Sequence, residues 1–185
     1  MEFKNYLFKK TLNIRNYRLL LCICILATFA GCSSSGEIKI NKPLTKTIDH
    51  HAVVSLSVAP AGDIDPNDET VKEVSQRLKG ELFGRLVSEG VFKQVVHAGE
   101  EAKYMLNIWL VDAKEVSQGA RIFFGVLAGS NSLAITGELM DSEIGKSSIL
   151  DFVVTGESAS HPFSSENDMD DAIREVVDEI ILALL

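Results

Sequence analysis

The chain contains few residue types that could carry out chemistry, and their spacing matches no catalytic motif. Its four histidines are His50, His51, His97 and His161. No GxSxG nucleophile elbow, HExxH zinc motif or GxxxxGK[ST] phosphate loop occurs in the sequence. His97 or His161 could meet a serine and an aspartate in space, but any domain of this composition offers that arrangement. We therefore expect no enzyme and no cofactor, and an unrecognised Ser/His/Asp site remains the alternative.

Two short patterns could suggest a metal site. His50 and His51 are adjacent, but neighbouring side chains on a strand point to opposite faces, so we do not expect them to share a metal. Asp63, Asp65 and Asn67 have the one-three-five spacing that begins a calcium loop.

The rest of that calcium pattern is missing. Position six is Asp68 where a glycine is needed, and position twelve is Val74 where a bidentate glutamate is needed. Turn residues and side-chain acceptors in this segment are typical of a capped helix start. We expect the capped helix and no metal.

Apolar periodicity predicts the elements that position these residues. Five strands are expected, at 52–59, 91–97, 104–115, 133–140 and 149–155, and helices at 67–89 and from 165–168 to 185. The first helix has one apolar stripe, Val71, Val74, Leu78, Leu82 and Leu86. Gly80 and Gly84 on this helix are expected to pack closely on the sheet. The strand at 104–115 is apolar on both sides except at Asn107 and Asp112, which predicts a central strand with Asn107 as a buried polar group.

Two helices with one apolar face each need a sheet face to cover. The predicted fold class is therefore α+β: a two-layer sandwich with a mainly antiparallel sheet of four to five strands and two helices on one face. The strands at 133–140 and 149–155 are expected to form an antiparallel hairpin.

The segment before the domain reads as an export signal. Residues 1–18 are basic, and the uncharged run 19–29 would span only about 16 Å as a helix, which is too short to cross a membrane. Phe29-Ala30-Gly31-Cys32 resembles the lipobox of bacterial lipoprotein signals, in which the cysteine is lipidated and becomes the mature N-terminus. Cys32 is thus the predicted lipidation site. An ordinary secretory signal with Cys32 left free is the less favoured alternative.

This interpretation divides the chain into a signal peptide at 1–31, a flexible tether at 32–50 and a single domain at 51–185. Ser33 at mature position two resembles the outer-membrane sorting pattern, so we expect a lipid-anchored protein facing the periplasm if the organism is Gram-negative. Removing residues 1–31 takes away five basic groups and one acidic group, which changes the net charge from −8 to −12. That charge argues against nucleic acid as a partner.

Several segments together resemble the bacterial lipoprotein family defined by the domain of unknown function numbered forty-four ten (DUF4410). They are the glycine-punctuated stretch 119–129, the turn with Asp141, Gly145 and Lys146, the exit Gly156-Glu157-Ser158 and the acidic helix 168–185. The resemblance implies an envelope lipoprotein with an α/β domain and no assigned activity.

The resulting function hypothesis is a non-catalytic binding or assembly module in the envelope, with an envelope hydrolase and a passive structural lipoprotein as alternatives. The partners expected are the membrane, through the lipid anchor, and an envelope protein of unknown identity. The apolar residues around 121–127 come in near succession, so no single face can bury all of them. The candidates for partner contact are Arg121, Phe123, Phe124, Val126 and Leu127. A buried irregular strand is the other reading of that segment.

Overall fold

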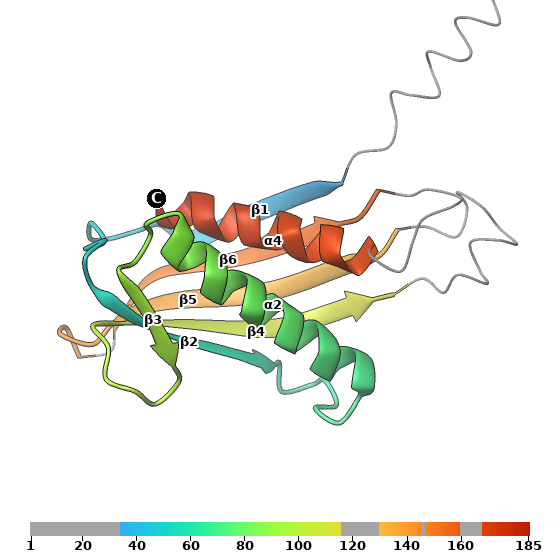
Figure 1. Ribbon diagram of the computed structural model, residues 1–185, viewed down its shortest axis with the longest axis horizontal. Coiled ribbons are helices and arrows are strands. Elements are labelled where there is room, and N and C mark those ends of the chain that lie inside the picture. Colours follow the sequence, from blue (N-terminus) through green and yellow to red (C-terminus); the bar gives the residue numbers. More distant parts are fainter. Residues whose placement is uncertain (1–33, 116–129, 146, 160–167) are drawn as a thin grey trace, which may run out of the picture. The chain divides into compact units, whose positions relative to one another are not determined.

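The fold is built from a curved mixed sheet and two long helices (Figure 1). The computed structural model describes residues 34–115, 130–145, 147–159 and 168–185. In chain order the elements are β1 (Ser35–Lys42), β2 (Val53–Pro60), α2 (Glu69–Ser88), β3 (Gln94–His97), β4 (Tyr104–Lys114), β5 (Ser132–Asp141), β6 (Ser147–Glu157) and α4 (Asp168–Leu184). The strands lie in the order β1-β6-β5-β4-β2-β3. This is the predicted α+β class.

The described sheet has six strands, so the predicted number of four to five is wrong. The sheet is also mixed: β2 pairs in parallel with β3 and β4, and the other three pairings are antiparallel. The predicted hairpin of β5 and β6 is confirmed.

The additional strand is β1, and it corrects the prediction of a flexible tether over 32–50. Residues 35–42 pair antiparallel with β6, with Ser35 opposite Glu157. Ile38 of β1 packs against the core. The compact unit therefore begins at Ser34 rather than at residue 51.

Both helices turn the predicted apolar face toward the core. On α2 the buried residues are Val74, Leu78, Leu82 and Leu86, while Val71 is only partly buried. The Asp68 carboxylate caps this helix by accepting from the Val71 amide at 3.1 Å, which confirms the capped start. Gly90, at φ 72°, follows its C-terminus and supplies the left-handed residue that the chain needs there.

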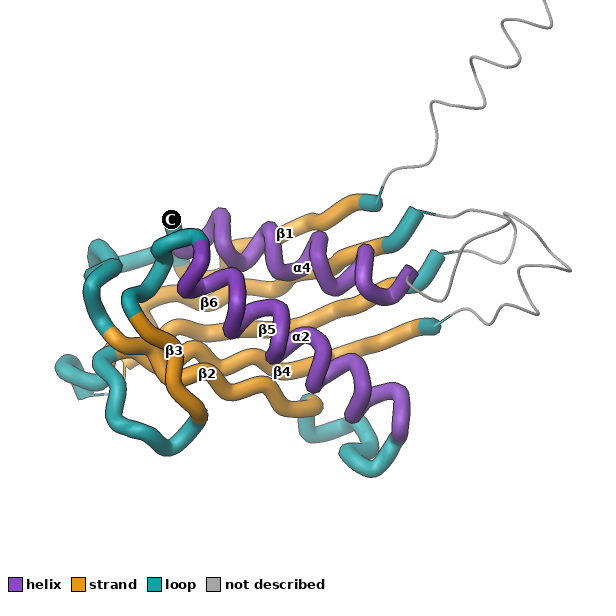
Figure 2. The backbone as a smooth tube through the Cα atoms, viewed as in Figure 1, coloured by secondary structure: helices purple, strands orange, loops and turns teal. Residues whose placement is uncertain are grey.

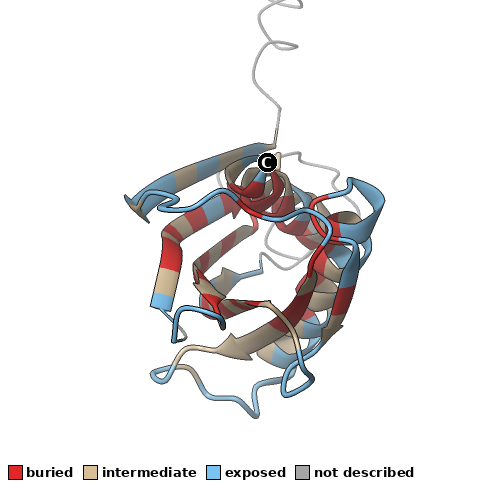
Figure 3. Ribbon diagram, turned by 90° about the vertical axis from the view of Figure 1, so that its left-hand side faces the viewer, coloured by how far each residue is buried: buried red, intermediate tan, exposed pale blue. Residues whose placement is uncertain are grey.

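Both helices lie on the same side of the sheet, and the buried residues gather between the sheet and the helices (Figure 3). Close approach of α4 requires glycine in the sheet: a Cβ on Gly156 would lie 2.4 Å from the Ala172 carbonyl oxygen. Gly80 and Gly84 of α2 do not play this part. A Cβ on either would meet nothing within 4 Å, so the expectation that they pack on the sheet is wrong.

The sheet has two ends, which we call the Ser35 end and the Asp141 end after a residue at each (Figure 2). At the Ser35 end, β1 and β5 begin and β4 and β6 finish, because Ser35 and Ser132 both pair with Glu157 and Lys114 pairs with Ser132. At the Asp141 end, β4 and β6 begin and β5 finishes, because Asp141 pairs with both Tyr104 and Ser147.

Candidate functional site

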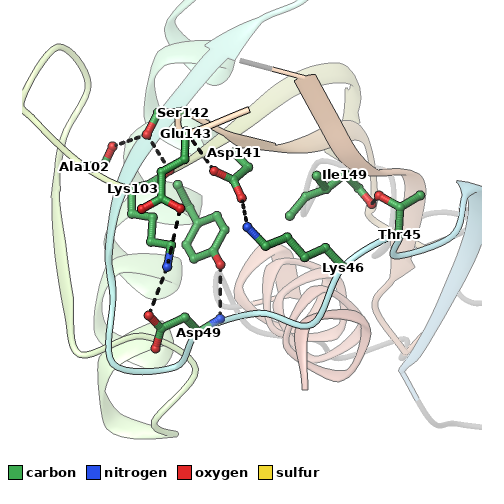
Figure 4. A network of polar contacts seen from close by, with 10 residues as sticks. Thr45, Lys46, Asp49, Ala102, Lys103, Asp141, Ser142, Glu143 and Ile149 are labelled. Atoms are coloured by element: carbon green, nitrogen blue, oxygen red, sulfur yellow. Dashed lines mark hydrogen bonds and ion pairs between the residues drawn. The ribbon is translucent and has the colours of Figure 1, made fainter. Parts of the chain in front are cut away.

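A buried carboxylate organises the Asp141 end of the sheet (Figure 4). The side chain of Asp141 is 0% exposed, and its Oδ2 lies 2.7 Å from Nζ of Lys46, which is 43% exposed. The other oxygen, Oδ1, accepts from the Glu143 amide at 2.9 Å. Asp141 thus ties the 43–52 connection to the β5–β6 turn.

A second ion pair lies beside the first. Lys103 Nζ is 3.1 Å from Asp49 Oδ2 and 3.9 Å from Glu143 Oε2. The Asp49 amide donates to the Tyr104 hydroxyl at 3.2 Å. Ser142 Oγ donates to the carbonyl of Lys103 at 2.7 Å, so the turn is also fastened to the start of β4.

These pairings set the protonation states of the charged groups. The hydrogen bond from Lys46 lowers the pKa of Asp141 below its ordinary value of 3.8, and the hydrogen bond from Lys103 lowers the pKa of Asp49 in the same way. The same bonds raise the pKa of Lys46 and of Lys103 above 10.5. At neutral pH the carboxylates are ionised and the amines protonated, so neither carboxyl is poised to act as a general acid and neither amine as a general base or nucleophile.

An open pocket of about 730 Å³ adjoins this network. Its wall includes Val53, Ser55 and Met105, and its rim includes Asp49, His51, Glu100, Glu101, Lys103 and Glu143. The volume falls in the range of small-molecule sites. The excess of carboxylates on the rim would favour a cationic ligand, although two of them already face Lys103.

The histidines within the described residues have other contacts. His50 Nδ1 lies 2.9 Å from the Val91 carbonyl oxygen, and the His97 ring lies 5.6 Å from the Phe83 ring, centroid to centroid. His161 lies outside the described residues. In the part of the chain that the structure describes, no group of three or more His, Cys, Asp or Glu side chains is placed to hold a metal ion.

Cys32 and the contact candidates Arg121, Phe123, Phe124, Val126 and Leu127 all lie outside the described residues. The described residues next to them in the chain lie at one end of the sheet. Ser35 follows Cys32 closely, and Lys114 and Ser132 flank the 116–129 segment, so both sets of predicted residues are connected to the Ser35 end.

Sequence reasoning missed the Lys46–Asp141 and Asp49–Lys103 pairs. Their partners are 95 and 54 residues apart, and no local pattern links them. Asn107 was singled out, and it is half-buried rather than buried; its amide donates to Glu138 Oε1 at 3.1 Å. The predicted need for a hydrogen-bond partner is confirmed.

A family model matches most of the sheet and α2. The matching family is described as a domain of unknown function (DUF4410), and the match covers residues 53–161. The chain belongs to the DUF4410 family. The match begins at β2 and ends at residue 161, so β1 and α4 lie outside it. None of the curated proteins compared with the chain matches it.

Some of the solved structures that match this chain come from bacteria. Two are PelC dodecamers from Paraburkholderia phytofirmans, one at 13% identity and TM-score 0.54 and the other, a point variant, at 15% and 0.53; each match covers 80% of this chain and 96% of that chain. Protein XCC0632 from Xanthomonas campestris, a DUF330 structure, matches at 9% identity and TM-score 0.46 over 80% of this chain and 90% of that chain. The PelC likeness supports the fold.

Neither described helix is long and apolar enough to cross a membrane.

Proposed function

We propose that this DUF4410 chain is an exported lipoprotein whose domain acts as a non-catalytic binding or assembly module in the bacterial envelope. The observation that carries the proposal is the position of Cys32, which ends an apolar segment of the lipobox type directly before the compact unit that starts at Ser34. Acylation with palmitate-like chains adds about 0.8 kcal/mol of membrane affinity per buried methylene, so two or three chains hold a protein at the bilayer. Ser33 at mature position two supports the outer membrane, facing the periplasm, in a Gram-negative cell.

The non-catalytic part of the proposal is supported by the network at the Asp141 end. Its charged groups neutralise one another across short contacts: Lys46 with Asp141 and Lys103 with Asp49. Ion-pair networks of this kind shift pKa values for structural reasons, without a catalytic role. The alternatives remain a hydrolase and a passive structural lipoprotein.

The partner is a protein in the envelope, and further copies of this chain are the first to test. The similar PelC structures are dodecamers by their own description. Arg121, Phe123, Phe124, Val126 and Leu127 are the proposed contact residues, since they form an apolar segment of the sequence between the last residue of β4 and the first residue of β5.

Mass spectrometry of the detergent-extracted protein tests the anchor. We expect a mature chain that begins at Cys32 and carries acyl groups, and a Cys32→Ser variant that no longer partitions into membranes. Retention of that variant in the membrane fraction would contradict the proposal.

Crosslinking in intact envelopes tests whether the domain binds a partner. We expect this chain to be crosslinked to a defined partner or to itself, and a Phe123→Asp, Phe124→Asp double variant to lose that product while staying folded and anchored. An unchanged crosslinking pattern would exclude the 121–127 segment as the contact surface, and no crosslinked product at all would favour the passive lipoprotein.

A further inference from the structure

The domain can lie only a short distance from its anchor, because residues 35–42 form a strand and not a flexible tether. Between Cys32 and Ser35, the first residue of β1, stand only Ser33 and Ser34. Fully extended, three residue steps reach about 11 Å. A flexible tether of about seventeen residues, by contrast, would reach about 55 Å.

The freely moving part of this link is even shorter, because Ser34 is hydrogen-bonded to the domain. Its hydroxyl donates to the Glu175 carboxylate of α4. Only Ser33 then stands between the lipidated residue and a residue fixed to the fold. The headgroup layer on each side of a bilayer is about 5 to 8 Å thick, which is comparable to this reach.

We propose that the Ser35 end of the sheet is the surface that rests on the lipid bilayer, and that the Asp141 end points away from the membrane. This inference rests on the proposed acylation of Cys32. The occupant of this surface is the lipid bilayer, because the chain leaves the domain at Ser35 and reaches Cys32 over two residues, and the acyl chains of Cys32 lie in the bilayer.

The strand register determines which residues share this surface. Ser35 pairs with Glu157, Glu157 with Ser132, and Ser132 with Lys114, so four strand ends lie side by side (Figure 2). The start of α4 lies at the same end, since Gly156 closely approaches Ala172. The bilayer therefore faces a broad end of the domain and not a single strand.

The opposite end is far from the membrane in this orientation. From Glu157 to Ser147, the strand β6 spans about 34 Å at the usual rise per strand residue. The polar network around Asp141 and the adjoining pocket of about 730 Å³ are then directed toward the aqueous compartment.

Charge attraction does not hold this orientation. Glu115 and Glu157 are exposed at the Ser35 end. These groups repel anionic headgroups, so the covalent link and not electrostatics keeps the end at the bilayer. Added salt should therefore leave the orientation unchanged.

Depth-dependent fluorescence quenching in the full-length lipidated protein tests the proposal. The chain has no cysteine after Cys32, so one introduced cysteine can carry a bimane label without competition. Glu157→Cys and Ser147→Cys are a matched pair, because both side chains are exposed and lie at opposite ends of β6. Vesicles of phosphatidylethanolamine and phosphatidylglycerol, with a nitroxide on a fraction of the headgroups, supply the quencher.

We expect the label at 157 to lose at least half of its fluorescence and the label at 147 to be nearly unaffected. Equal quenching at the two positions, or stronger quenching at 147, would overturn the orientation. Cosedimentation with vesicles and the acylated mass of Cys32 are measured on the same samples. A protein that fails those two controls refutes the proposed function, whereas an anchored protein with the wrong quenching pattern refutes the orientation alone.

A longer link provides the second variant. Inserting a flexible glycine-serine segment of about fifteen residues between Ser33 and Ser34 should preserve cosedimentation and the melting temperature but reduce quenching at 157 severalfold. Quenching that persists at full strength in this variant would overturn the role assigned to the short link.

Discussion

The contribution of Asp141 to the stability of the fold depends on pH in a predictable direction. Its pKa is lowered by the hydrogen bond from Lys46, so the stabilising contribution is present above the ordinary value of 3.8 and is lost as pH falls through the lower pKa of the folded protein. We expect Asp141→Asn to lower the melting temperature at pH 7, and the difference from the parent protein to shrink below about pH 4. Thermal unfolding followed by circular dichroism between about pH 3 and pH 7 checks this.

An exposed ion pair supplies the control. Asp171 pairs with Arg174 at 3.0 Å on the surface of α4, where both side chains are solvated, and such pairs contribute little. Asp171→Asn should leave the melting temperature nearly unchanged. A loss as large as that of Asp141→Asn would show that net charge, and not the buried pair, is responsible.

Alanine substitutions at two glycines should change the free energy of unfolding in opposite directions. Gly156→Ala places a methyl group against the Ala172 carbonyl oxygen, a backbone atom that can move only with α4, so we expect a loss of about 1 to 3 kcal/mol in unfolding free energy. Gly80→Ala adds a methyl group in open space on α2 and should stabilise by about 0.5 to 1 kcal/mol. Urea titration measures both. If Gly80→Ala destabilises, the exposed face of α2 has been placed wrongly.

At the scale of elements, α2 is held by a stripe that the sequence already predicts. Leu78 and Leu82 are fully buried against the sheet, and truncating either to alanine should cost about 2 to 5 kcal/mol. The exposed Val87 on the same helix is the matched position, where Val87→Ala should cost well under about 1 kcal/mol. Equal effects at the buried and exposed positions would mean that α2 is rotated about its axis.

The status of β1 as a strand has a direct test. Ile38 packs against the core, whereas Lys39 points to the other face and is exposed. Ile38→Asp should therefore lower the melting temperature markedly because it buries an unpaired charge, while Lys39→Asp should have little effect. In a flexible tether neither substitution would matter, so two unchanged melting curves would restore the tether and remove the basis for the membrane orientation.

At the scale of the whole molecule, the described core runs without interruption from β2 to α4. One core predicts one cooperative unfolding transition. Trp109 on β4 is the only tryptophan of the chain, so its fluorescence reports the middle of the sheet, and far-ultraviolet circular dichroism reports both helices. The two probes should give the same midpoint in urea. Separate midpoints would mean that α2 or α4 unfolds independently of the sheet.

The parts of the fold that the sequence predicted are those that depend on neighbouring residues. The stripe of α2, the wide apolar face of α4 and the β5–β6 hairpin all follow from periodicity within one segment. β1 carries only a weak alternation, Ile38 and Ile40 between polar residues. Ile40 is exposed, and Ile38 meets the core only because β6 arrives from far along the chain. The Lys46–Asp141 pair was hidden for the same reason, since its partners are 95 residues apart.

The pairing of β1 with β6 also constrains when the protein can fold during its synthesis. Ser35 is among the first residues of the domain to be made, yet its partner Glu157 is made near the end. Closing a loop of this length costs about 4 kcal/mol of chain entropy, so the sheet edge cannot form early. Until then β1 is an unpaired strand, the situation in which chains mispair with one another. A chain interrupted before β6 would have no partner for its first strand, which makes completion of synthesis a condition of reaching the native sheet.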